Sequence, residues 1–252
     1  MPGLILCATQ RCGSTMIVED IRNTGVLGLP EEYFIPWDSS KKEVDWVAAL
    51  QGIKNKAKTS NGFYSIKVMA NHLPVIDECL KGSRFDTKDS NSVLFPRFRE
   101  AFKDCKFLMI RRDSIVRQAV SREMSRQTGV NHATKNENDE HFAGNLMKGY
   151  QENYNKKTHY NLKGVGNEVK KISAENALWE SFFESNEIKS PLVLRYEEVC
   201  KNFPAYLTRI SNFTNVPLEQ DLDFQQRKMV RLSNSVNDEW VKSYLKDFGY
   251  SV

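Results

Sequence analysis

The sequence predicts an α/β fold of three layers, in which a central, mainly parallel sheet is covered by helices on both faces. Short continuous apolar runs of strand length recur along the chain. Segments with apolar residues at three- and four-residue intervals lie between these runs, and this alternation is typical of such a sheet. The 252 residues are 40% apolar and 27% charged, an ordinary globular composition, so we expect one domain over residues 1–252.

The first predicted strand runs from Leu4 to Ala8, an apolar stretch that polar and glycine residues follow at once. Met16, Ile17 and Ile21 then recur at helical spacing, and Gly25 is a suitable C-terminal cap. The chain therefore begins as strand, polar loop and helix. Further strands are predicted at 62–68, 105–110 and 191–196, and helices at 93–102, 114–124, 174–183 and 203–213.

The segment at about 125–170 differs from the rest of the chain, since it is rich in Asn, Lys and Glu and poor in aliphatic residues. Phe142, Leu146, Tyr150 and Tyr154 keep a helix-like spacing, which predicts an amphipathic helix within a mobile insertion. The insertion is either a solvated surface excursion or a lid over a ligand, and the sequence favours neither.

Charge and composition exclude several classes of protein. The 36 Lys and Arg residues against 32 Asp and Glu give a net charge of +4 without a basic stripe, which suits a small polyanionic ligand better than a nucleic acid. The apolar run at residues 4–8 is too short for a membrane span or a signal peptide, so we expect a cytoplasmic protein.

Cysteine and histidine spacing predicts neither a disulfide framework nor a metal site. The cysteines form no CxxC pair, and the histidines lack metal-ligand spacing and stand among polar residues. We expect most of the cysteines to act as small apolar residues and the histidines to face solvent. The residues concerned are Cys7, Cys12, Cys79, Cys105, Cys200, His72, His132, His141 and His159.

The loop after the first strand, Gln10 to Thr15, is the first candidate site. A loop between a strand and a helix points backbone N–H groups and the positive helix end at a bound anion. Gly13 allows the backbone to approach an anion closely, and Arg11 supplies a planar guanidinium that can donate two parallel hydrogen bonds to it. A nucleotide triphosphatase loop needs G-x-x-x-x-G-K-[ST], whose Lys and first Gly are absent. By itself the loop is either an anion cradle or a helix cap.

The opening of the chain resembles one family. T-Q-R-C-G-S-T at residues 9–15, with T-G-V-L-G-L-P-E-E-Y-F at residues 24–34, is similar to the start of the bacterial Stf0-type sulfotransferases. These enzymes transfer a sulfuryl group from 3′-phosphoadenosine 5′-phosphosulfate (PAPS) and release 3′-phosphoadenosine 5′-phosphate (PAP). The resemblance implies a P-loop-containing sulfotransferase fold and, because the family commonly forms dimers, a homodimer.

Three later segments also resemble that family. Residues 66–69 are similar to its G-x-K-x-M strand, and residues 111–121 to its R-x-D-x-x-x-Q-A-V-S segment. Residues 231–240 are similar to its C-terminal R-Q-A-D-x-x-S-E-E-W, although Asn234 and Asn237 depart from that pattern. The resemblance therefore spans most of the chain, apart from residues 35–60 and 125–170.

The resemblance implies two anion pockets at the carboxyl ends of the predicted strands. The first would hold the phosphosulfate with the loop residues Arg11, Cys12, Gly13, Ser14 and Thr15. The second would hold the 3′-phosphate with Arg112 and Ser121, and Arg231 is a weaker candidate for the same nucleotide. The alternative for Arg112 is a surface ion pair with Asp113 or a neighbour, and for Arg231 a solvated charge.

Sulfuryl transfer moves SO₃ in line from a phosphate oxygen to an acceptor, so the protein must position the reactants, stabilise charge on the leaving group and remove a proton. Arg11 would stabilise the leaving phosphate. The family pattern places the general base at Glu32, with Glu31 ranked second. Without the resemblance, this acidic pair would be read as an exposed turn.

The remaining predicted acceptor contacts are Gln10, Lys67, Tyr33 and Phe34. Gln10 would bond the acceptor, as the resemblance implies, and Lys67 either assists near the bridging oxygen or is solvated. Tyr33 and Phe34, with Trp37, form a sugar-stacking wall, a core edge or a subunit contact.

The leading hypothesis is a PAPS-dependent sulfotransferase that acts on a hydroxyl of a carbohydrate or glycolipid, without a metal. Sulfation of another small polar metabolite, at oxygen or at an amine, is an alternative. A P-loop small-molecule kinase is a second alternative, which the absent Lys disfavours. A catalytically silent PAP-binding module is the third.

Overall fold

The computed structural model describes residues 3–87, 93–219 and 227–249. At its centre four parallel strands lie in the order β2-β1-β3-β6. They are β1 (Gly3–Ala8), β2 (Tyr64–Met69), β3 (Cys105–Arg111) and β6 (Leu192–Arg195). Every residue of β1 and β2 is buried, which explains their continuous apolar character. The predicted strands and the parallel central sheet are confirmed.

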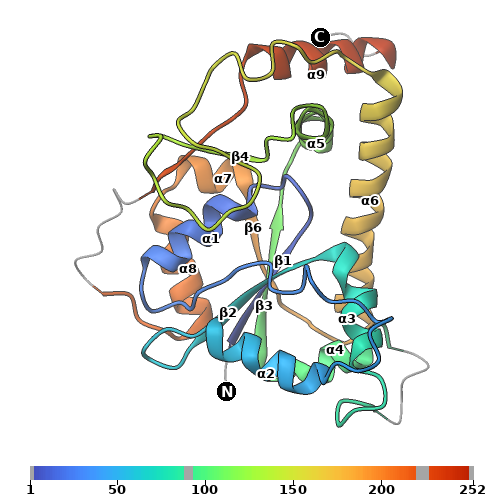
Figure 1. Ribbon diagram of the computed structural model, residues 1–252, viewed down its shortest axis with the longest axis vertical. Coiled ribbons are helices and arrows are strands. Elements are labelled where there is room, and N and C mark those ends of the chain that lie inside the picture. The colour runs from blue at the N-terminus through green and yellow to red at the C-terminus, as the bar shows by residue number, and fades with distance from the viewer. Residues whose placement is uncertain (1–2, 88–92, 220–226, 250–252) are drawn as a thin grey trace.

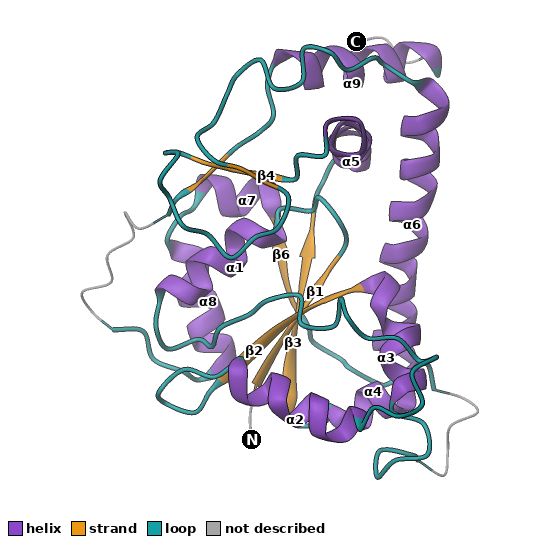
Figure 2. Ribbon diagram, in the orientation of Figure 1, coloured by secondary structure: helices purple, strands orange, loops and turns teal. Residues whose placement is uncertain are grey.

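Helices cover both faces of this sheet (Figures 1 and 2). Because successive strand residues point to opposite faces, Ile5 and Cys7 pack in one core with Trp179 of α6 (Leu162–Ser185). Leu4 and Leu6 pack in a second core with α1 (Ser14–Asn23) and α8 (Ala205–Thr214). The other helical segments are α2 (Trp46–Lys56), the 3-10 turn η1 (Ala70–His72), α3 (Leu73–Cys79), α4 (Pro96–Ala101), α5 (Ile115–Thr128), α7 (Tyr196–Lys201) and α9 (Ser235–Asp247). The predicted α/β class is confirmed.

A third core lies where α5, α6 and α9 meet, and α9 crosses one end of the molecule in Figure 1. Val120, Val165 and Trp240 are buried there. The two asparagines that depart from the family pattern have a local role, because the Asn237 side chain accepts from the Asn234 backbone N–H at 3.0 Å in a capping box at the start of α9. Among the described residues, no helix has the length and apolar character to cross a membrane.

The predicted amphipathic helix around residues 142–154 is wrong. The one regular element within these residues is the short strand β5 (Leu146–Met147), which joins β4 (His132–Thr134) and β7 (Met229–Val230) in a second, three-stranded sheet of order β5-β4-β7. Phe142 packs against the α1 side of the molecule, whereas Tyr154 packs with α5 and α9. The four-residue spacing of these side chains therefore does not reflect one helix, because they pack in two different cores. Residues 162–170, at the end of the predicted insertion, form the start of α6.

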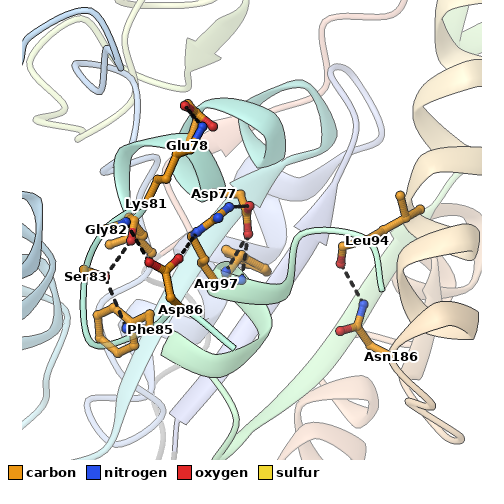
Figure 3. A network of polar contacts seen from close by, with 12 residues as sticks. Asp77, Glu78, Lys81, Gly82, Ser83, Phe85, Asp86, Leu94, Arg97 and Asn186 are labelled. Atoms are coloured by element: carbon orange, nitrogen blue, oxygen red, sulfur yellow. Dashed lines mark hydrogen bonds and ion pairs between the residues drawn. The ribbon is translucent and has the colours of Figure 1, made fainter. Parts of the chain in front are cut away.

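A polar network fastens α3 to α4 (Figure 3). The Asp77 carboxylate accepts from the Arg97 backbone N–H at 2.8 Å and from its guanidinium at 2.9 Å. It also accepts from the Phe98 N–H at 3.0 Å, so Asp77 caps the start of α4. Arg97 pairs with Asp86 as well. We call Asp77, Asp86 and Arg97 the Arg97 cluster.

Candidate active site

A cavity of about 660 Å³ opens at the carboxyl ends of the four parallel strands. Residues 10–16 follow β1, His72 follows β2, Arg112 follows β3 and Tyr196 follows β6, and all of them except Cys12 line it. The chain runs from β1 to β2 on one side and then returns past β1 to β3, so its direction reverses at β1. Open parallel sheets bind ligands at this point, and the volume suits a small ligand.

The loop after β1 is shaped by two residues with left-handed backbone. Arg11 has φ 67° and Gly13 has φ 91°. A Cβ on Gly13 would lie 2.2 Å from the ring of Tyr196, so only glycine fits. The turn brings Ser14 and Thr15, at the start of α1, to the cavity wall. The positive end of α1 therefore faces the cavity.

The Arg11 side chain, predicted for the first anion pocket, contacts Ser121, which was predicted for the second. Its Nε donates to Ser121 Oγ at 3.1 Å, and its Nη1 donates to the Asn131 carbonyl. Burial lowers the pKa of Arg11 to about 10, which leaves the group charged near neutral pH. A guanidinium has five N–H groups, so these two bonds leave donors for an anion. Arg11 and Ser121 line the same cavity.

Arg112 lies beneath the cavity with its guanidinium 4.9 Å from the Tyr196 ring centre. Its side chain is 10% exposed, and Nε lies 3.7 Å from the Glu197 carboxylate. That buried Nε has no hydrogen-bond partner among the described residues. Asp113 pairs with Arg195 at 2.6 Å rather than with Arg112. The contact with Glu197 is the ion pair with a neighbour that the sequence left open, but Arg112 also lines the cavity, so its charge faces a ligand there as well.

Four side chains from separate elements form a chain of contacts along the cavity wall. Lys67 Nζ lies 2.7 Å from Glu32 Oε1 and donates to Thr15 Oγ1 at 3.2 Å. Thr15 Oγ1 lies 3.5 Å from His132 Nε2. We call Glu32, Lys67, Thr15 and His132 the Lys67 cluster, and all four line the cavity. The structure therefore places a carboxylate and an ammonium beside the positive end of α1.

The sequence of the chain matches the model of the Stf0 sulphotransferase family over residues 3–247. The chain belongs to this family. It is 24% identical to trehalose 2-sulfotransferase of Mycolicibacterium smegmatis, over 96% of this chain and 94% of that protein. It is 22% identical to trehalose 2-sulfotransferase of Mycobacterium tuberculosis over the same shares. The family assigns sulfotransferase activity to the chain.

Several site residues that the family resemblance implied do not line this cavity. Cys12 is fully buried and its N–H donates to the Thr9 carbonyl at 3.2 Å, so that amide is not free for an anion. Glu31 pairs with Arg22 at 2.8 Å. Adjacent side chains in this non-helical segment diverge, so Glu32 alone of the acidic pair reaches the cavity.

The aromatic wall is also corrected. Phe34 is 2% exposed and packs edge-on against Trp37 with ring centres 4.9 Å apart. The Tyr33 hydroxyl donates to the Leu29 carbonyl at 2.7 Å, and Tyr33 packs on the same core. The core interpretation holds for Phe34 and Trp37, since apolar burial gains more here than exposure to a polar ligand.

Lys67 and His132 differ from their solvated interpretations. Lys67 is 4% exposed, and its backbone N–H donates to the Glu31 carbonyl at 3.1 Å. Burial, together with the charges of Arg11 and Lys67, lowers the pKa of His132 to about 2. His141 is not solvent-facing either, with a side chain that is 2% exposed.

Tyr196, His132 and Arg227 are among the cavity residues that sequence reasoning missed. Tyr196 is the last residue of a predicted strand, so the rule that ligands lie at carboxyl ends of strands was a usable signal. His132 and Arg227 carried no signal, because the pairing of β4 with β7 brings these regions together. Among the described residues, no group of three His, Cys, Asp or Glu side chains could hold a metal ion.

Proposed function

We propose that the protein transfers a sulfuryl group from PAPS to a hydroxyl of a small acceptor, a carbohydrate or glycolipid. The observation that carries the proposal is the Lys67 cluster, which sets the Glu32 carboxylate beside the positive end of α1 within one cavity. A base and an anion-stabilising helix end are the two groups that in-line sulfuryl transfer requires. We further propose that residues 1–252 act as one domain.

Two features of the cavity fit a nucleotide that carries two phosphate groups. At the α1 end, Arg11, Ser14 and Thr15 line the cavity beside the positive end of the helix. At the other end, the charged side chains of Arg112 and the exposed Arg231 line the same cavity. PAPS supplies the sulfuryl group, and the residues at the α1 end would hold its phosphosulfate.

In this mechanism Glu32 accepts the proton of the acceptor hydroxyl while that oxygen forms a bond to sulfur. The bond from sulfur to the bridging phosphate oxygen breaks, and the charge that develops on that oxygen is stabilised by Arg11, Ser14 and Thr15. Lys67 holds the Glu32 carboxylate at 2.7 Å. Burial of these donors strengthens their effect, because the charges act in a medium of low dielectric.

The acceptor would enter beside Gln10 and Glu32. A neighbouring cavity of about 460 Å³ shares Gln10, Asn131, Asn145 and Glu175 with the first, which leaves room for an acceptor larger than one sugar ring. The carbohydrate class is supported by the names of the two relatives, both trehalose 2-sulfotransferases. The residues on this side are polar, as a hydroxylated acceptor requires.

Calorimetric titration under identical salt tests the nucleotide. PAP, adenosine 5′-phosphosulfate and ATP–Mg²⁺ are compared, and we expect tight PAP binding that weakens strongly without the 3′-phosphate. Preference for ATP–Mg²⁺ would contradict the proposal in favour of a kinase. Incubation with PAPS and a panel of sugars and amines then separates O-sulfation, N-sulfation and a silent PAP-binding module, and light scattering tests the implied homodimer.

A further inference from the structure

His132 belongs to no motif, yet its ring lies in the cavity wall. We propose that His132 is a positioning residue that donates from Nε2 to Thr15 Oγ1 and so turns the Thr15 hydroxyl proton toward an anion at the start of α1. The inference rests on the proposed function, because it assumes that a phosphate group is bound there. It adds a role for the second sheet, on which His132 lies.

The hydrogen-bond inventory of Thr15 supports this direction. A hydroxyl has one proton and two lone pairs, and an ammonium can only donate. Lys67 Nζ donates to Thr15 Oγ1 at 3.2 Å, which uses one lone pair. His132 Nε2 lies 3.5 Å away, at the limit of a hydrogen bond. If Nε2 donates to the second lone pair, the hydroxyl proton is left to point into the cavity, where an anion would accept it.

The charges around the ring keep His132 neutral. Burial lowers the pKa of His132, and the cations Arg11 and Lys67 lower it further, as does His141. A neutral imidazole has one N–H and one bare nitrogen. It therefore adds a donor to the Thr15 hydroxyl without adding a third positive charge beside Arg11 and Lys67.

The backbone holds the ring in place from both directions. The N–H groups of Asn131 and His132 donate to the Asn145 carbonyl at 2.9 and 3.3 Å. The Asn131 carbonyl accepts from Arg11, and Ala133 pairs with Val230 of β7. The same short segment therefore anchors Arg11 and carries His132, so the two groups are positioned together.

Nitrogen-15 NMR of the histidine-labelled protein tests the tautomer directly. We expect His132 to be neutral and protonated on Nε2 between pH 5 and 8, both free and with PAP. A ring protonated on Nδ1 alone, or a charged ring at pH 7, would overturn the proposal. This measurement uses the unsubstituted protein and needs no enzymatic turnover.

A double-mutant cycle on PAP affinity tests the route through Thr15. We expect His132→Leu to weaken PAP binding by about three- to tenfold, which is the range of one ordinary hydrogen bond, and His132→Gln, which retains an N–H donor, to restore most of it. Thr15→Val should abolish the effect of His132→Leu, because the ring acts through that hydroxyl. The exposed His159→Leu is the matched control and should leave affinity unchanged.

Additive losses in the double variant, or no rescue by glutamine, would assign His132 a structural role and overturn the proposal. An unchanged affinity in His132→Leu would overturn it as well. Absence of PAP binding by the unsubstituted protein would instead contradict the proposed function. PAP binding whose affinity does not change when His132 is substituted would contradict only this inference.

Discussion

The Lys67 cluster and the Arg97 cluster each pair a carboxylate with a basic side chain, but they differ in what surrounds that pair. In the Arg97 cluster, the Asp77 carboxylate accepts hydrogen bonds from two backbone N–H groups and a guanidinium at the start of α4. In the Lys67 cluster, all four side chains line a cavity and come from separate elements. The comparison teaches that an ion pair whose carboxylate caps a helix stabilises the fold, whereas an ion pair that lines a cavity lies within reach of a ligand.

The largest expected effect separates Glu32, a member of the Lys67 cluster, from the adjacent Glu31. Glu32→Gln should keep PAP affinity and lose at least tenfold in turnover, toward the roughly 10²–10⁴ that a general base contributes. Its matched control is Glu31→Gln, since Glu31 pairs with Arg22 and does not line the cavity. Steady-state rates with PAPS measure both variants. Equal turnover of the two would remove Glu32 from the mechanism and break the comparison.

Arg112 tests the far end of the same cavity. Arg112→Ala should weaken PAP binding by roughly 1.5–3 kcal/mol, the range for a hydrogen bond to a charged group. The neighbouring Arg111 pairs with Glu180 outside the cavity, so Arg111→Ala serves as the control. Calorimetry with PAP measures both. If Arg112→Ala binds PAP normally, the 3′-phosphate pocket lies elsewhere.

The two clusters should change the free energy of unfolding differently as the pH falls. The pKa of His132 is lowered to about 2 in the fold, against about 6.5 unfolded, so the unfolded chain takes up a proton below pH 6.5 that the fold does not. This penalty reaches about 2 kcal/mol at pH 5 and is absent at pH 8. In the Arg97 cluster, the hydrogen bond from Arg97 lowers the pKa of Asp86. The Asp86–Arg97 pair therefore loses its stabilising effect only when the pH falls far enough to protonate the Asp86 carboxylate.

Urea unfolding at pH 8 and pH 5 measures that difference. His132→Gln should lose less stability than the unsubstituted protein between the two values, whereas Asp86→Asn should lose as much. Identical losses for His132→Gln and the unsubstituted protein would show that the ring is solvated or charged in the fold.

The smallest expected effect belongs to the Arg97 cluster. Asp77→Ala removes the cap of α4 and should lower the free energy of unfolding by about 1–2 kcal/mol. This corresponds to a fall in Tm of about 2–8 °C for a chain of this size. Thermal unfolding measures it, and turnover at 20 °C should stay unchanged. A loss of turnover in the folded variant would contradict the division between fastening pairs and reactive pairs.

The sequence predicted the strands of the central sheet because each is a buried apolar run bounded by polar residues. It predicted the anion-facing loop because Gly13 and the hydroxyls stand between a strand and a helix. The second sheet could not be found in this way, since β4, which carries His132, pairs with β7 from a distant part of the chain. Phe34 and Glu31 were predicted to contact the acceptor but do not line the cavity. A motif identifies a segment of the site, but it does not show which side chains of that segment face the cavity.

The pairing of Ala133 with Val230 also sets an order of events in the cell. The loop, α1 and the four parallel strands are all synthesised before β7 leaves the ribosome, but the strand that carries His132 has no partner on that side until then. Long-range pairing of this kind is slow, because a long stretch of chain must close first. A nascent chain can therefore bury its central sheet while the cavity wall that carries His132 is still unfinished, so the cavity takes its final form only after β7 has been synthesised.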